Sequence, residues 1–100
     1  MAFWLKFSAR TLHEIGEAHE WYDAQSPGLG EELLAAIELQ LRRLEQAPTL
    51  YAEVIPNVHR ALLPRFPYAL FYTIHQDLIH VLAVIHTARN PRRWPKEGGR

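Results

Sequence analysis

The stretch YALFYTIHQDLIHVLAVIHT, residues 68–87, is the part of the sequence that decides the fold. It holds two apolar runs, residues 68–75 and residues 78–87, rich in the β-branched and aromatic residues favoured in strands. The dipeptide Gln76-Asp77 interrupts them. The middle of each run is apolar on both faces, whereas a strand with one face in water alternates apolar and polar residues. The two runs are therefore expected to be central strands of a sheet that helices cover on at least one side.

Two further strands are expected upstream of this pair. Residues 58–63, VHRALL, read with a period of two and are separated from the first apolar run by the break PRFP. Residues 2–8, AFWLKFS, place Phe3, Leu5 and Phe7 on one face, which predicts a strand with one buried side. This N-terminal strand has no neighbouring strand in the sequence, so we expect it to pair with one of the central strands across the intervening helices.

The segment between the first strand and the later ones has helical periodicity in two parts. In the first part, apolar residues recur at helical spacing and four acidic residues lie on the opposite side. The second part carries an apolar stripe and is expected to end before Pro48, because the residue before a proline avoids the helical region. The inward positions expected are Leu12, Ile15, Ala18 with His19 and Tyr22 in the first helix, and Leu29, Leu33, Ile37, Leu41 and Leu44 in the second.

The joint QSPGLG, residues 25–30, ends the first helix. Ser26 is expected to cap the second helix, with Pro27 at its first position. A short joint predicts that the two helices pack antiparallel as a hairpin. The order of one strand, two helices and three strands is typical of an α+β fold, with the helical hairpin on one face of a small, mostly antiparallel sheet. One domain is expected over residues 1–95, with residues 96–100 as a frayed tail.

The composition excludes several classes of protein. The chain has 100 residues and no cysteine, which predicts one domain without disulfides or thiol chemistry. No apolar run is long enough for a membrane span and the N terminus does not fit a signal peptide, so we expect a cytoplasmic protein. The formal net charge is zero, but residues 14–45 hold eight acidic and two basic residues, and residues 54–100 hold seven basic and two acidic residues. This asymmetry favours an anionic partner for the basic half.

Neither a metal nor a cofactor is predicted. Of the six histidines, His13 and His19 fall on different faces of the first helix. His80 and His86 share a face of the last strand, but they lie about 20 Å apart at the rise of an extended chain. These spacings resemble no ligand set. No serine or threonine lies on a glycine-flanked elbow, and no glycine-rich loop with a lysine is present to hold a phosphate.

What remains is a basic cluster in the second half of the sequence. Its members are Arg60, Arg65, Arg89, Arg92 and Arg93, together with His86 and Trp94. Arginines bind phosphate through paired donors, and a tryptophan can stack on a base or fill a partner's pocket. Histidine and arginine can also cleave RNA without a metal. The alternative is structural, with Trp94 folded back over the sheet edge and RNPRR as a solubilising tail.

Three blocks of the sequence are similar to one protein family. The blocks are HEWYDAQSPGLGEELLAAIE (residues 19–38), HRALLPRFPYALFYTI (residues 59–74) and VLAVIHTARNPRRW (residues 81–94). Together they resemble the RelE/ParE superfamily of toxins from bacterial type II toxin–antitoxin modules, also called plasmid-stabilisation proteins. The likeness runs from Phe3 to Trp94, and FPYALFY with the closing pattern H-x-x-R-x-P-x-x-W is its specific part. The fold implied by the resemblance is a helical hairpin packed on a small antiparallel sheet.

The resemblance implies one of two activities. RelE-like toxins are ribosome-dependent endonucleases that cut mRNA, whereas ParE-like toxins bind and block DNA gyrase. In the endonuclease case the catalytic residues would be Arg60, His86 and Arg89. Two other basic positions of RelE-like nucleases fall on Leu62 and Ala69, and this chain is neutral where those toxins are strongly basic. The resemblance therefore favours a gyrase inhibitor that is not an enzyme. Its expected target-binding residues are Arg65, Arg89, Arg92, Arg93 and Trp94.

Both kinds of toxin are neutralised by a cognate antitoxin, which is the partner that the resemblance implies here. Trp4, Trp21 and Leu39 lie off the apolar stripes and are expected to contact it. The antitoxin could place a helix in a groove beside the hairpin or add a strand to an open sheet edge, and the acidic hairpin would suit a basic segment. A third possibility is a non-toxic binding module of the same fold.

Overall fold

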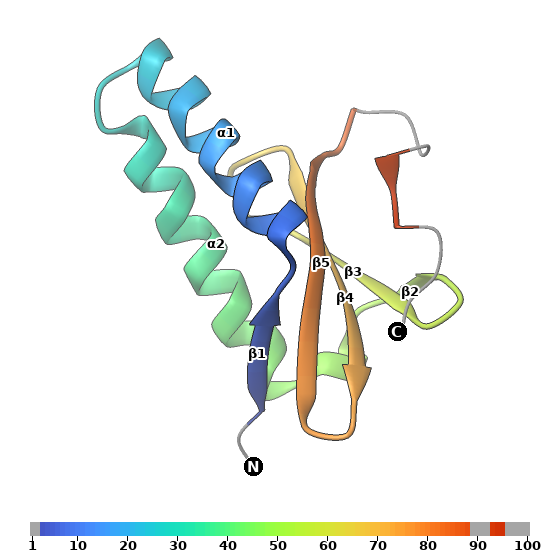
Figure 1. Cartoon of the computed structure of the whole chain (residues 1–100). Helices are drawn as coiled ribbons and strands as arrows, with labels where there is room; N and C mark the ends of the chain where they lie inside the picture. Colours follow the sequence, from blue (N-terminus) through green and yellow to red (C-terminus); the bar gives the residue numbers. More distant parts are fainter. Residues whose placement is uncertain (1–2, 89–92, 96–100) are drawn as a thin grey trace.

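The structure, a computed structural model, describes residues 3–88 and 93–95. Two helices lie side by side against one face of a sheet (Figure 1). The elements are β1 (Trp4–Phe7), α1 (Ala9–Gln25), α2 (Leu29–Gln46), the 3-10 helix η1 (Pro48–Leu50), β2 (Glu53–Ile55), β3 (Val58–Leu62), β4 (Tyr68–His75) and β5 (Leu78–His86). This is the α+β fold that the sequence predicts. No helix in the described part of the chain is long and apolar enough to cross a membrane.

The sheet has five strands in the order β1-β5-β4-β3-β2. The two apolar runs form β4 and β5 and are central, as predicted, and β1 finds its partner in β5. The β1–β5 pair is parallel and the other three pairs are antiparallel. The prediction of three strands after the helices missed β2, which has only three residues and turns into β3 through Asn57 in a left-handed conformation. A strand of that length is too short to show alternation.

The two faces of the sheet differ in what covers them. On the helix face, side chains of β3, β4 and β5 join those of both helices in the main core. The opposite face, which we call the open face, carries a smaller apolar cluster made of Val58, Ala69, Phe71, Ala83 and Ile85. Val54, Ile55, Leu82 and Trp94 pack against this cluster. The prediction that β4 and β5 are apolar on both faces is therefore confirmed.

A bulge in β5 changes which of its residues face the helices. Phe71 pairs with Ala83, but the next residue, Tyr72, pairs with Val81, so Leu82 has no partner of its own. Before the bulge, odd-numbered residues of β5 face the helices, and after it the even-numbered ones do. The expectation that His80 and His86 share a face is therefore wrong. His80 lies on the open face, and His86 lies on the helix face.

The helical stripe of α1 differs from the predicted one at its start. Leu12 is 60% exposed, and the neighbouring Thr11 is fully buried in its place. The Thr11 hydroxyl donates a hydrogen bond of 2.9 Å to the Val81 carbonyl, and Ser8 caps the helix by accepting from the Thr11 backbone N–H. A threonine can occupy this buried position because its hydroxyl has a partner there. Hydrophobicity alone could not show that.

The turn of the hairpin also differs from the prediction. Ser26 ends α1, with its N–H donating to the Tyr22 carbonyl, and it does not cap α2. The N-cap of α2 is Gly28 at a φ of 90°, a left-handed conformation that favours glycine. The side-chain oxygen of Asp23 on α1 accepts from the backbone N–H groups of Gly28 and Gly30, at 3.2 and 2.9 Å. The start of α2 is thus capped from the other helix.

Candidate functional site

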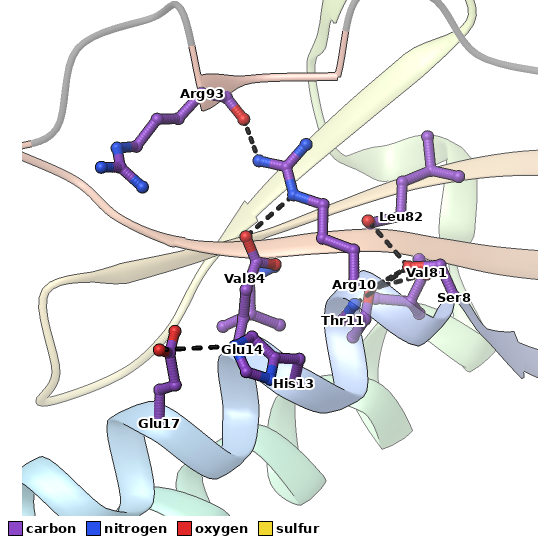
Figure 2. A network of polar contacts seen from close by, with 10 residues as sticks. All are labelled: Ser8, Arg10, Thr11, His13, Glu14, Glu17, Val81, Leu82, Val84 and Arg93. Carbon is purple, nitrogen blue, oxygen red and sulfur yellow. Dashed lines mark hydrogen bonds and ion pairs between the residues drawn. The ribbon is translucent and has the colours of Figure 1, made fainter.

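The first turns of α1 seal the edge of β5 beyond the point where β1 ends (Figure 2). The Ser8 hydroxyl donates to the Leu82 carbonyl at 3.0 Å, and the Thr11 hydroxyl donates to the Val81 carbonyl. One carboxylate oxygen of Glu14 accepts from the Val84 backbone N–H at 2.8 Å. Side chains of a helix thus take the hydrogen-bonding places of an absent strand. A strand from a partner therefore cannot pair with this stretch of β5. The sheet edges where a strand can be added are the outer edges of β1 and β2.

Arg10 extends this network to the last described segment of the chain. Its Nε donates to Glu14 at 2.9 Å, and its Nη2 donates to the backbone carbonyl of Arg93. Figure 2 shows the Arg93 side chain extending away from Arg10. The contact therefore holds the backbone of Arg93 and leaves its guanidinium exposed, as a target-binding residue would need to be.

Trp94 packs on the open face of the sheet. Its ring lies 5.2 Å from that of Phe71, and the Arg60 guanidinium carbon lies 5.5 Å from the Trp94 ring centroid. The aromatic ring is therefore enclosed between the open-face cluster and a stacked cation. Trp94 is half-buried and holds the end of the described chain against β3 and β4.

The structure does not bring Arg60 and His86 together. Arg60 pairs with Phe71 and so lies on the open face. His86 pairs with Tyr68 on the helix face, where the two rings meet edge to face at 5.2 Å. The Nδ1 atom of His86 accepts from the Ala88 backbone N–H at 3.1 Å, which assigns the ring proton to Nε2. Arg89, the third member of the expected catalytic set, lies outside the described residues.

The other expected target-binding residues are dispersed. Arg65 follows β3, and its guanidinium lies 2.7 Å from the Glu32 carboxylate on α2. Both side chains are more than half exposed, so this ion pair contributes little to stability. Arg65 thus lies beside the hairpin, whereas Trp94 lies on the open face. Arg92, like the predicted tail at residues 96–100, falls outside the described residues.

The three residues expected to contact an antitoxin are all exposed, at 71% for Trp4, 57% for Trp21 and 43% for Leu39. They lie on β1, α1 and α2. Figure 1 places β1 and the C-terminal end of α1 at opposite ends of the molecule, so the two tryptophans form no common patch. Sequence periodicity missed the exposed Leu12 by assigning it to the core.

Leu12 belongs to a groove between the two helices, which we call the hairpin groove. Its volume is about 480 Å³. The lining residues are Phe7, Leu12, Ile15, Glu31, Leu34, Ala35, Ile37, Glu38 and Leu41. Its wall is largely apolar, and the two carboxylates in it are exposed. An amphipathic helix with basic flanks is the complementary shape and charge.

Two titratable side chains of the sheet have shifted pKa values. Burial raises the pKa of Tyr72, whose hydroxyl donates to the Pro48 carbonyl at 2.6 Å and so ties η1 to the core. Burial, and then the charge of Lys6, lowers the pKa of His80 on the open face. In residues 3–88 and 93–95, no group of three histidine or acidic side chains is placed to hold a metal ion.

Comparison with known proteins gives one family and several similar folds. Residues 5–91 match the family model described as the ParE toxin of the type II toxin–antitoxin system parDE. No curated protein sequence matches the chain. Among solved structures, the chromosomal ParDE toxin–antitoxin system of P. aeruginosa contains a chain that is 18% identical, with a TM-score of 0.75 over 85% of this chain and 96% of that one.

Structures with RelE have the same fold as well. A chain of the intact E. coli RelBE toxin–antitoxin complex is 19% identical, with a TM-score of 0.67 over 88% of this chain and 100% of that one. The isolated E. coli RelE toxin is also 19% identical, with a TM-score of 0.66 over 89% of this chain and 88% of that one. At these identities the likeness establishes the fold alone.

Proposed function

The chain belongs to the ParE toxin family of type II toxin–antitoxin systems, and from this premise we propose that it inhibits DNA gyrase by binding and does not cleave mRNA. Membership of the family makes it a toxin of such a module, with a cognate antitoxin as its partner. The part that we propose is the target, DNA gyrase and not the ribosome, and the arrangement of the open face supports this target.

The observation that carries the proposal is the separation of Arg60 from His86. Metal-free RNA cleavage needs a proton-transfer group and cations around the same phosphate. Here the arginine and the histidine lie on opposite faces of the sheet. One phosphate cannot contact both side chains in this arrangement.

The open face also has apolar residues where cations would be needed. Leu62 and Ala69 occupy the two positions at which RelE-like nucleases carry further basic residues, and they are direct cross-strand partners. Loss of a single preorganised donor to a transition-state oxyanion lowers a rate by about 100- to 1,000-fold. Two such losses at adjacent positions favour a toxin that acts by binding.

For the antitoxin, the proposal places an amphipathic helix in the hairpin groove. The groove lies on the acidic half of the chain and exposes apolar side chains that include Leu12. Leu12→Glu should weaken the complex with the antitoxin, because it places a carboxylate in the apolar part of the groove. Leu50→Glu, at an exposed leucine that does not line the groove, is the matched control.

The target is tested by pulse-labelling DNA and protein synthesis separately after the protein is induced alone in a bacterium. The expected result is that DNA synthesis falls first and that the purified protein inhibits supercoiling by gyrase. Loss of protein synthesis first, with cleaved mRNA on purified ribosomes, would overturn the proposal. If neither synthesis falls, the chain is a binding module without toxicity in that host.

Variants make the same test sharper. Under the gyrase proposal, Arg93→Ala should weaken inhibition, whereas His86→Gln should leave it unchanged because His86 faces the helices. A nuclease would show the reverse pattern. Circular dichroism of each variant confirms that the fold is retained.

A further inference from the structure

A second cavity lies between α1 and the end of β5, on the other side of α1 from the hairpin groove. Its volume is about 560 Å³, within the range of pockets that hold ligands. We call it the α1–β5 pocket. The lining residues are Glu14, Glu17, Ala18, Trp21, Tyr22, Tyr68, Val84 and His86. The proposed function does not use this pocket.

Four aromatic rings form a continuous wall of the pocket. Trp21 and Tyr22 meet edge to face at 4.9 Å, Tyr22 and Tyr68 lie 6.2 Å apart, and Tyr68 meets His86 at 5.2 Å. These residues come from α1, β4 and β5, so the wall exists only in the folded protein. Trp21, more than half exposed, offers its ring to an incoming group. The faces of tryptophan and tyrosine rings attract cations.

Among the described residues, the charges that line the pocket have one sign: two lining residues are glutamates and none is lysine or arginine. Glu14 is already occupied, since it accepts from the Val84 N–H and pairs with Arg10. Glu17 lies 3.4 Å from a histidine nitrogen of His13, and its side chain is 66% exposed. Its carboxylate can therefore turn to a cation that enters from solvent.

We propose that the α1–β5 pocket binds the guanidinium group of an arginine in the antitoxin segment. Arginine fits better than lysine, because its planar group stacks on an aromatic ring while its forked donors meet a carboxylate. α1 lines both hollows, with Leu12 and Ile15 in the hairpin groove and Glu17 and Trp21 in the pocket. A segment that crosses α1 can thus reach both. The inference rests on the antitoxin partnership but not on the identity of the target.

The pocket is tested by NMR on the full-length protein, made by cell-free synthesis with ¹⁵N label. The three tryptophans give three indole N–H signals, which Trp→Phe variants assign. The probe is the peptide acetyl-Gly-Arg-Gly-amide, and its citrulline analogue is the neutral control of the same shape. We expect saturable movement of the Trp21 signal with the arginine peptide and little with the citrulline peptide. The exposed Trp4, outside the pocket, should not respond.

Two matched variants separate the pocket from a general attraction of charges. Glu17→Gln should weaken peptide binding by about threefold, as expected for an exposed ion pair. Glu20→Gln removes an exposed carboxylate of the same helix that does not line the pocket, and binding should not change. Equal effects of the two variants, equal binding of both peptides, or equal movement of the Trp4 signal would overturn the proposal.

The experiment also separates this inference from the proposed target. If the protein fails to inhibit gyrase but its Trp21 signal moves with the arginine peptide, the pocket inference holds and the gyrase proposal is wrong. If the protein inhibits gyrase but its Trp21 signal does not respond to the peptide, the gyrase proposal holds and the pocket inference is wrong. In the antitoxin complex, substitution of each antitoxin arginine by glutamine in turn should identify one whose loss moves the Trp21 signal toward its position in the free toxin.

Discussion

The two faces of the sheet show two different ways of covering apolar side chains. The helix face is covered by α1 and α2, which contribute fully buried residues such as Leu33 and Leu44. The open face has a smaller cluster, and the aromatic cover described there is the half-buried Trp94 under the Arg60 guanidinium. Burial on the helix face therefore supplies most of the folding energy. The five cluster residues of the open face are buried as well, but Leu62 beside them is 55% exposed, so part of this face is accessible to a partner.

The largest expected effect tests this comparison with one substitution on each face. Leu33→Ala, at a fully buried position of the helix face, should lower the free energy of unfolding by about 2 to 5 kcal/mol, because it leaves a cavity in the core. Leu62→Ala, on the exposed part of the open face, should change it by less than about 0.5 kcal/mol. Urea unfolding measures both. Similar losses would mean that the open face is covered in solution.

A smaller effect tests the seal between α1 and β5. Thr11→Val keeps the side-chain volume but removes the hydroxyl that donates to the Val81 carbonyl. The Val81 carbonyl still accepts from the Ser8 backbone N–H at 3.1 Å, so urea unfolding should show the loss of one buried hydrogen bond, about 0.5 to 1.5 kcal/mol. Thr87→Val, at an exposed threonine, is the control and should have little effect. If Thr11→Val is neutral, the Thr11 hydroxyl contributes nothing to closing the edge of β5.

Trp94 tests what the open face contributes. Trp94→Ala should lower the free energy of unfolding by about 1 to 2 kcal/mol, because a half-buried aromatic loses its contacts with Phe71 and Arg60. Trp94→Phe should recover part of the loss. Urea unfolding and gyrase inhibition are measured on the same samples. A variant of unchanged stability that no longer inhibits gyrase would make Trp94 a direct target contact and not an anchor.

The smallest effect is a pH dependence from the open face. Burial and Lys6 hold the pKa of His80 below its ordinary value of 6.5, so the unfolded chain binds this proton more readily than the folded one. Stability should therefore fall as the pH drops below about 6.5, with no contribution from His80 above that pH. His80→Gln should flatten this part of the profile of urea midpoints, and Lys6→Gln should flatten it less. An unchanged profile in His80→Gln would contradict the assignment.

Local pattern was enough to predict the helical hairpin and the central strands. The spacing of Leu33, Ile37 and Leu44 specifies a buried stripe whatever the helix packs against. The apolar runs that became β4 and β5 likewise indicate burial on both faces. The resemblance to a toxin family also came from residues alone, and the family match over residues 5–91 confirms it. These features depend on neighbours in the sequence, which is why sequence alone determined them.

The tertiary structure decided where the functional candidates face. In a regular strand His86 would lie on the same face as His80 and Arg60, but the bulge at Leu82 turns it toward the helices. No periodicity shows a bulge, because the extra residue is accommodated by the strand alongside and by the helix that seals the edge. Asp23 of α1 likewise caps α2, a different helix. The wall of the α1–β5 pocket brings together Trp21 of α1 and Tyr68 of β4, which are far apart in the sequence. The sequence determined which residues are available, and packing between elements decided which of them meet.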